Sequence, residues 1–236
     1  MIQNCMKLVV DWDFAECMKD TELNSLSKQL MYGHAENKKA PKPVNLIITG
    51  CVSSKLRGRL KSTGADNWGV DIYPKDDPVE QPVSKEGDIT DHSTPKQSWY
   101  TDLFDKDKLV YLTADSENTI EKFEDDKIYI IGGIVDRNRH KNIWLKKATE
   151  QGIAHGKFPI KESINIGDYS TILTVNQVIS VILAVKKYDN DWEKALKETL
   201  PHRKTNKVKG RKAKECRKEE EAKAEEEEEK QKEYTD

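Results

Sequence analysis

Apolar and polar residues alternate in blocks along the first two thirds of the chain, and the blocks predict strands and helices in turn. Four short apolar runs rich in β-branched residues each end in a Gly, Thr or Asp cluster: 7–10, 44–49, 109–114 and 128–135. Continuous apolar runs of this length are typical of parallel strands that are buried on both faces. We therefore predict a buried, mainly parallel sheet.

Between and after these runs, apolar residues recur at helical spacing. The predicted helices are 19–37, 53–61, 116–124, 141–151, 174–188 and 191–200. Ser53 is a candidate N-cap, Ser116 or Thr119 caps the third helix, and Gly152 follows the fourth as a C-terminal glycine. Strands that alternate with helices predict an α/β domain, which we place at residues 1–203.

Two segments depart from this alternation. Residues 74–98 contain four of the eight prolines and many charges, so a long loop is expected there. Residues 204–236 are of low complexity, with bases first and acids later, and are expected to form a disordered charged tail.

Composition excludes several classes of protein. Charged residues make up 35% of the chain, but the net charge is only −2, so charge alone does not indicate a nucleic-acid partner. No apolar run approaches the roughly 18 residues of a membrane span, and the first residues lack the order of a signal peptide. The four cysteines form no CxxC pair, which argues against a zinc site or a disulfide framework and favours a reducing compartment.

The most informative stretch is the end of the fourth apolar run. In parallel sheets, ligands bind beyond the carboxyl ends of the strands, and Gly132, Gly133 and Asp136 lie where this strand would leave the sheet. Asp136 alone fits a turn residue or a helix cap. Five basic or amide residues follow it. Basic residues at the start of a helix oppose the helix dipole, so stability alone would not favour them. The alternative interpretation is that they contact phosphates or nucleobases.

Other candidate chemistry is weaker. The chain has no GxGxxG motif after its first strand and no P-loop, which disfavours a nucleotide-dependent enzyme of the usual kind. Candidate phosphate contacts cluster in the second predicted helix, although a solvated surface would explain each base separately: Lys55, Arg57, Arg59 and Lys61.

Several segments, taken together and in order over roughly residues 4–204, resemble one family. They are VVDWDF (9–14), YLTADS (111–116), YIIGGIVDRNRHK (129–141), GIAHGKFPI (152–160), LTVNQV (173–178) and DWEKALKETLPHRK (191–204). The chain resembles the tRNA (guanine-9-N1)-methyltransferase family of the SPOUT superfamily, and is most similar to its single-chain fungal and cytosolic-nuclear branch.

The resemblance implies a SPOUT methyltransferase fold: a mainly parallel sheet flanked by helices, with a C-terminal trefoil knot that no periodicity argument would reveal. It implies S-adenosylmethionine as methyl donor, held by the knotted loops. Carried onto this sequence, the implied cofactor-binding residues are Leu112, Thr113, Gly132, Gly133, Arg137, Asn138, Arg139, His140, Lys141, Leu145, Ile153, Phe158, Pro159, Thr171, Ile172, Leu173, Thr174 and Asn176.

The resemblance also implies the reaction and its setting. Asp136 stands at the position of the proposed general base for methylation of guanine N1, and no metal is required. The expected partner is tRNA, contacted by the bases of residues 55–61 together with Arg137 and Arg139. The family acts as a monomer without a membrane or an obligatory protein partner, in the cytoplasm, the nucleus or both. Members carry a basic N-terminal extension, which is absent or trimmed here.

Two other functions remain open on the residues. Methylation of adenine N1 would need no base, because that nitrogen carries no proton at neutral pH, and Asp136 alone does not separate the two substrates. A non-catalytic tRNA-binding module would keep the fold and lose the reaction.

Overall fold

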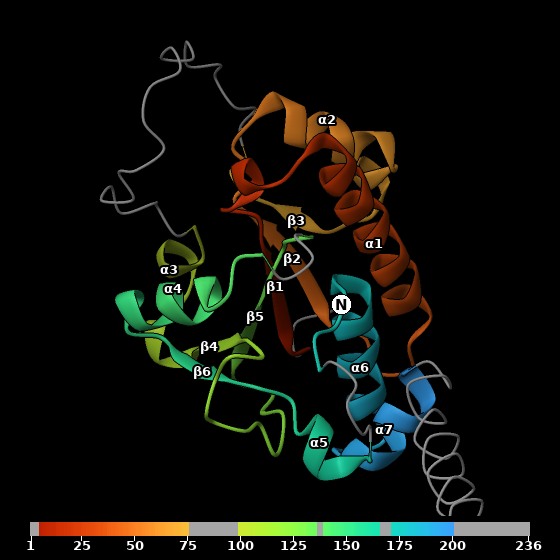
Figure 1. Ribbon diagram of the computed structural model, residues 1–236. Helices are drawn as coiled ribbons and strands as arrows, with labels where there is room; N and C mark the ends of the chain where they lie inside the picture. Colours follow the sequence, from red (N-terminus) through yellow and green to blue (C-terminus); the bar gives the residue numbers. More distant parts are fainter. Residues whose placement is uncertain (1–4, 76–98, 136–138, 166–170, 201–236) are drawn as a thin grey trace, which may run out of the picture.

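The structure is a computed structural model that describes residues 5–75, 99–135, 139–165 and 171–200. Its centre is a six-stranded, all-parallel sheet in the order β3-β2-β1-β5-β4-β6 (Figure 1). The strands are β1 (Lys7–Asp11), β2 (Asn45–Thr49), β3 (Asp71–Ile72), β4 (Leu109–Leu112), β5 (Ile128–Gly132) and β6 (Ala154–Gly156). The predicted α/β class with a parallel sheet is confirmed, and the trefoil knot stays a prediction.

Helices cover both faces of this sheet, with α1, α2 and α6 on one side and α3 and α4 on the other (Figure 1). The α-helices are α1 (Asp20–Lys39), α2 (Ser54–Ser62), α3 (Trp99–Leu103), α4 (Ile143–Gln151), α5 (Ile160–Ser163), α6 (Val175–Lys187) and α7 (Trp192–Thr199). Short 3-10 turns are η1 (Ala15–Cys17), η2 (Ala65–Asn67) and η3 (Lys106–Lys108).

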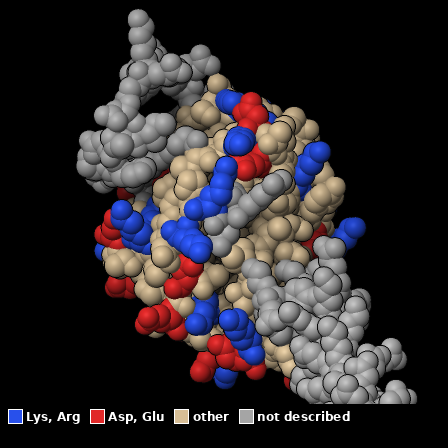
Figure 2. Space-filling view, viewed as in Figure 1, with Lys and Arg blue, Asp and Glu red and all other residues tan. Residues whose placement is uncertain are grey.

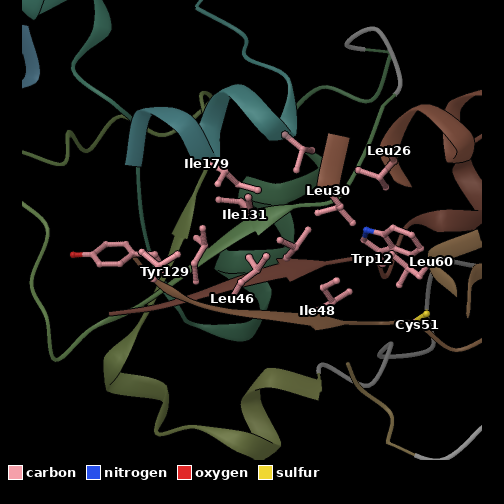
Figure 3. Close-up of a cluster of buried hydrophobic side chains, with 14 of the residues drawn as sticks. Trp12, Leu26, Leu30, Leu46, Ile48, Cys51, Leu60, Tyr129, Ile131 and Ile179 are labelled. Carbon is pink, nitrogen blue, oxygen red and sulfur yellow. The ribbon is translucent and has the colours of Figure 1, made fainter. Parts of the chain in front are cut away.

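Alternation along the central strands explains why their sequences are apolar throughout. In β1, Leu8 and Val10 pack toward α1 and α6, whereas Val9 packs toward α4, and all three are fully buried. Figure 3 shows the first of these layers, which includes Leu46 and Ile131 of the sheet and Ile179 of α6. A strand buried on both faces needs no polar residue in its middle.

Two predicted helix ends are confirmed, at Ser53 and at Gly152. The Ser53 hydroxyl accepts a hydrogen bond from Leu56 N at 3.2 Å and caps α2. Helix α4 ends at Gly152, whose φ of +60° is left-handed and suits a residue without Cβ.

The predicted helix 116–124 is wrong. Ile120 N donates to Lys157 O at 2.9 Å, and Lys157 N donates to Asn118 O at 2.8 Å, so this segment pairs with the chain that follows β6. The predicted cap Ser116 is instead buried against His155 Nδ1 at 2.8 Å. Long-range pairing has overridden local helix preference here.

Four short elements were not predicted from the sequence: β3, β6, α3 and α5. None exceeds five residues, which is too short for a periodic pattern to stand out. The predicted loop 74–98 lies outside the described residues from position 76, and the predicted tail 204–236 lies entirely outside them. Among the described residues, no helix combines the length and apolar character needed to cross a membrane.

Candidate functional site

A cavity of about 280 Å³ opens at the carboxyl ends of β4, β5 and β6. Its walls come from the segment after β4, the turn before α4, α5, the segment before α6 and the first turns of α6. In parallel sheets, this edge is where ligands bind. The cavity therefore lies where the sequence predicted a site.

Many of the predicted cofactor-binding residues line this cavity although they come from five separate parts of the chain. These residues are Leu112, Thr113, Gly132, His140, Phe158, Thr171, Ile172 and Leu173. Sheet topology explains their convergence, because strands that run in parallel deliver the residues that follow them to the same edge.

A second group of predicted residues does not line the cavity: Gly133, Arg139, Lys141, Leu145, Ile153, Pro159, Thr174 and Asn176. Ile153 is buried in the core on the α4 side of the sheet. Thr174 is the N-cap of α6 and donates its hydroxyl to the amide oxygen of Asn176 at 2.8 Å. Asp136, Arg137 and Asn138 lie outside the described residues.

The cavity also has lining residues that were not predicted from the sequence: Ala114, Asp115, Ile131, Ile134, Trp144, Gly156, Lys157, Ile160, Lys161, Glu162, Val175 and Val178. Most of them sit next in sequence to a predicted residue, so a wider window around each strand end would have included them. Trp144 also has a predicted neighbour, Leu145, but an aromatic residue in an amphipathic helix is typical of ordinary packing.

Two neighbouring glycines allow close packing at the floor of the site. A Cβ on Gly132 would lie 2.1 Å from Trp144 Cε2, and one on Gly133 would lie 2.3 Å from Trp12 Cδ1. These indoles belong to opposite faces of the sheet, since Trp12 packs with the α1 layer and Trp144 with the α4 layer. The Gly-Gly pair therefore lets β5 end between two indole rings.

One hydrogen bond links two segments that border the cavity. Asp115 accepts from Asn142 N at 3.0 Å, and Asn142 has a left-handed φ of +59° at the start of α4. The Asp115 carboxylate thus ties the segment after β4 to the residues that follow β5. This contact joins two walls of the site.

A buried group of charges lies beside the Trp144 wall. Lys147 Nζ is 2.5 Å from both Asp11 Oδ2 and Asp13 Oδ2, and the three side chains are 7%, 0% and 6% exposed. Tyr111 donates its hydroxyl to Asp11 Oδ2 at 2.9 Å and stacks on Trp144 with 5.6 Å between ring centroids. Burial, reinforced by the Asp11 charge, raises the pKa of Tyr111 well above its usual value, so the phenol remains a donor.

This group was not predicted. The three charged residues span positions 11–147, and a lysine in an amphipathic helix reads as solvated. In the structure Lys147 also lies 5.4 Å from the Phe14 ring centroid and 5.2 Å from that of Tyr100. Its ammonium group is thus paired with carboxylates and faced by aromatic rings.

Most of the basic residues of α2 that were predicted to bind RNA form ion pairs or hydrogen bonds with other residues of the chain. Lys55 and Arg59 both pair with Asp20, at 2.6 and 3.1 Å, and Arg57 donates to Pro74 O. Lys61 also has an interaction within the chain. Figure 2 shows blue and red side chains interspersed on this view of the molecule, with no uniformly basic surface.

Arg139 also forms an ion pair within the chain, with Glu22 of α1 at 2.7 Å.

Among the described residues, no group of three or more His, Cys, Asp or Glu side chains could hold a metal ion.

Comparisons with known proteins show which family the chain resembles in sequence. A family model described as tRNA (guanine(9)-N(1))-methyltransferase TRM10/TRM10A matches residues 1–205. The tRNA (guanine(9)-N1)-methyltransferase of Schizosaccharomyces pombe is 38% identical over 213 residues, covering 86% of this chain and 60% of the relative. The tRNA methyltransferase 10 homolog A of Xenopus tropicalis is 34% identical, covering 85% of this chain and 53% of the relative. The chain thus spans about half to three fifths of the length of these curated relatives.

Solved structures show the same fold. The crystal structure of full-length spTrm10 in complex with SAH has a TM-score of 0.66 and 37% identity, and covers 83% of this chain and 95% of that one. A dual-specific Trm10 from Thermococcus kodakaraensis has a TM-score of 0.58 at 15% identity, covering 82% of this chain and 99% of that one, which supports the fold alone. With the family model matched over most of its length, the chain belongs to the TRM10/TRM10A family of tRNA (guanine(9)-N(1))-methyltransferases.

Proposed function

We propose that this chain transfers a methyl group from S-adenosylmethionine to N1 of guanine at position 9 of tRNA. Family membership supports the reaction, and the SAH in the spTrm10 crystal structure supports the donor, because S-adenosylhomocysteine is the demethylated form of S-adenosylmethionine. The observation that carries the proposal is the cavity at the carboxyl edge of the sheet, which is lined by eight of the residues that the resemblance assigned to the cofactor.

The chemistry of the cavity walls fits this cofactor. Apolar side chains such as Leu112, Ile131 and Val178 suit an adenosine ring system, and the carboxylates of Asp115 and Glu162 suit positive groups. Lys157 and Lys161 would complement a carboxylate. The volume of about 280 Å³ lies close to the lower end of small-molecule sites, which is roughly 300 Å³.

S-adenosylmethionine supplies a methyl group on a sulfonium, which is already a strong electrophile. N1 of guanine carries a proton at neutral pH, so its lone pair must be freed before the N–C bond forms. We assign Asp136 as the acceptor of that proton, directly or through a water that it holds. The chain's other contribution is positioning, and alignment of two reactants supplies several kcal/mol in favourable cases.

The substrate base must leave the stacked core of folded tRNA, at an expense of a few kcal/mol. We propose that the basic side chains of α2, together with Arg137 and Arg139, contact tRNA phosphates and offset this free-energy cost. Phosphate contacts do not read the nucleobase sequence. Recognition should therefore depend on tRNA shape, and tRNA binding should weaken as the salt concentration rises.

Mass spectrometry of a tRNA transcript tests the reaction. After incubation with the chain and S-adenosylmethionine, one methyl group should appear on N1 of guanine 9. A matched transcript with adenine at position 9 shows whether adenine is also accepted. Methylation of neither transcript, under conditions where S-adenosylhomocysteine binds, would reject the proposed reaction.

Asp136→Asn tests the proposed proton acceptor. The variant should slow guanine methylation by roughly 100-fold or more, the usual contribution of a positioned base, and keep its affinity for S-adenosylhomocysteine. Single-turnover rates between pH 6 and 9 measure the effect. An unchanged rate throughout that range would mean that Asp136 handles no proton.

A further inference from the structure

The first turn of α1 collects cations from two distant parts of the chain. Asp20 Oδ1 lies 2.6 Å from Lys55 Nζ and 3.1 Å from Arg59 Nη2, both on α2. Glu22 Oε2 accepts a hydrogen bond from Arg139 Nη2 at 2.7 Å. These three cations are among the residues predicted from the sequence to contact RNA.

Connectivity places all of them at one edge of the sheet. Helix α1 begins nine residues after β1 ends, α2 begins five residues after β2 ends, and Arg139 follows β5. Since the strands are parallel, these segments all leave from the carboxyl ends, where the cavity opens. A phosphate backbone approaching the cavity would therefore meet these cations while they are paired with carboxylates.

The pairs differ in how firmly they are held. Lys55 and Asp20 are 59% and 63% exposed, whereas Arg59 is 17% exposed and also donates to Asn24 Oδ1. Glu22 additionally accepts from Lys19 N at 2.9 Å at the start of α1. Exposed pairs contribute little to stability, so the Asp20–Lys55 pair is the one that a phosphate can displace most easily.

The Lys55 hydrogen bond is the main cause of a lowered pKa for Asp20. The carboxylate therefore keeps its negative charge at neutral pH, and it competes with any phosphate for the same cations.

We propose that Asp20 is an electrostatic brake on tRNA binding: it occupies Lys55 and Arg59 in the free protein and has to be displaced when phosphates bind. This inference rests on the proposed function, and it adds that a carboxylate of the chain lowers the chain's own affinity for tRNA. Substitution of Asp20 should then strengthen binding, although most changes in a binding surface weaken it.

Equilibrium binding of a guanine-9 tRNA transcript to the full chain tests the brake. Asp20→Asn should bind about twofold to fivefold more tightly than wild type, the range expected from an exposed ion pair. The slope of log K against log salt should steepen by up to about 0.9, the value for one additional phosphate contact. Unchanged or weaker binding would overturn the inference, the latter because Asp20 would then be organising the bases for RNA.

Two controls separate this effect from general changes in charge or folding. Glu193→Gln removes a carboxylate that is 61% exposed and paired with Lys197 on α7, and it should leave tRNA affinity within twofold of wild type. Equal tightening by both variants would reduce the effect to net charge and overturn the brake. S-adenosylhomocysteine affinity should match wild type in Asp20→Asn, which shows that the fold is intact.

Lys55→Gln completes a double-mutant cycle. It should weaken tRNA binding more in the Asp20→Asn background than in wild type, because only the released lysine engages a phosphate fully. Equal losses in both backgrounds would overturn the assignment of Lys55. A wild-type chain that methylates the transcript while Asp20→Asn binds no more tightly refutes the brake alone, whereas a wild-type chain that binds no tRNA refutes the proposed function as well.

Discussion

Replacing Lys147 with methionine tests whether the buried charges beside the cavity hold the domain together. The substitution keeps an unbranched side chain of similar length, puts a thioether sulfur in place of a methylene and removes the ammonium group. Asp11 and Asp13, which are 0% and 6% exposed, would then lose the cation that lies 2.5 Å from each of them. Desolvated carboxylates without a counter-ion are the main source of destabilisation when a buried pair is broken.

The expected loss in the free energy of unfolding is about 3–5 kcal/mol, the range for removing one partner of a buried ion pair. For a domain of this size, roughly 2–4 °C of Tm accompanies each kcal/mol, so Tm should fall by about 6–20 °C. Urea unfolding monitored by circular dichroism measures the free energy, and calorimetry measures Tm.

Lys146 provides a matched control on the same helix. It is 69% exposed and lies 3.7 Å from Glu150, so Lys146→Met should change the free energy of unfolding by less than about 0.5 kcal/mol. If Lys147→Met and Lys146→Met unfold within about 1 kcal/mol of each other, the two aspartates do not depend on Lys147, and the reasoning from buried charge is wrong.

Two further substitutions test the packing of the site and a buried thiol. Gly132→Ala would place a Cβ 2.1 Å from Trp144 Cε2 and should lower stability by about 1–3 kcal/mol and weaken S-adenosylhomocysteine binding in calorimetry, whereas Gly58→Ala, with no atom within 4 Å of its new Cβ, should do neither. Burial raises the pKa of Cys51 to about 11, so the folded thiol stays protonated where the unfolded one ionises. The stability that this thiol contributes is present below about pH 9 and is lost as pH rises toward 11. In urea unfolding, the free energy of unfolding of Cys51→Ala should therefore fall less over that pH interval than that of wild type. An equal fall in both proteins would contradict the raised pKa of Cys51.

Local signals in the sequence predicted much of the architecture. The four apolar runs are β1, β2, β4 and β5, because a strand buried on both faces must be apolar at every position. Ser53 and Gly152 marked helix ends, since caps depend on atoms within one turn. The same reasoning failed at residues 116–124, where pairing with Lys157 replaces the helix that local preference indicated.

The candidate site was predicted in part. The rule that ligands bind at the carboxyl ends of parallel strands located it. The resemblance to a family named eight of its twenty described lining residues, among them Leu112 and Thr113 but not Asp115. Trp144 was missed although it precedes the predicted residue Leu145, because an aromatic side chain in an amphipathic helix is typical of ordinary packing.

The sequence by itself determined the α/β class, the order of most elements and the family, since these follow from periodicity, caps and motifs that span a few residues each. Only the tertiary structure decided which charges meet. Lys147 is buried between two aspartates more than 130 residues earlier, and Asp20 holds two bases of α2. Charged side chains carry no local record of their partner, because an ion pair depends on how the sheet brings distant segments to one edge and on how much water that arrangement excludes.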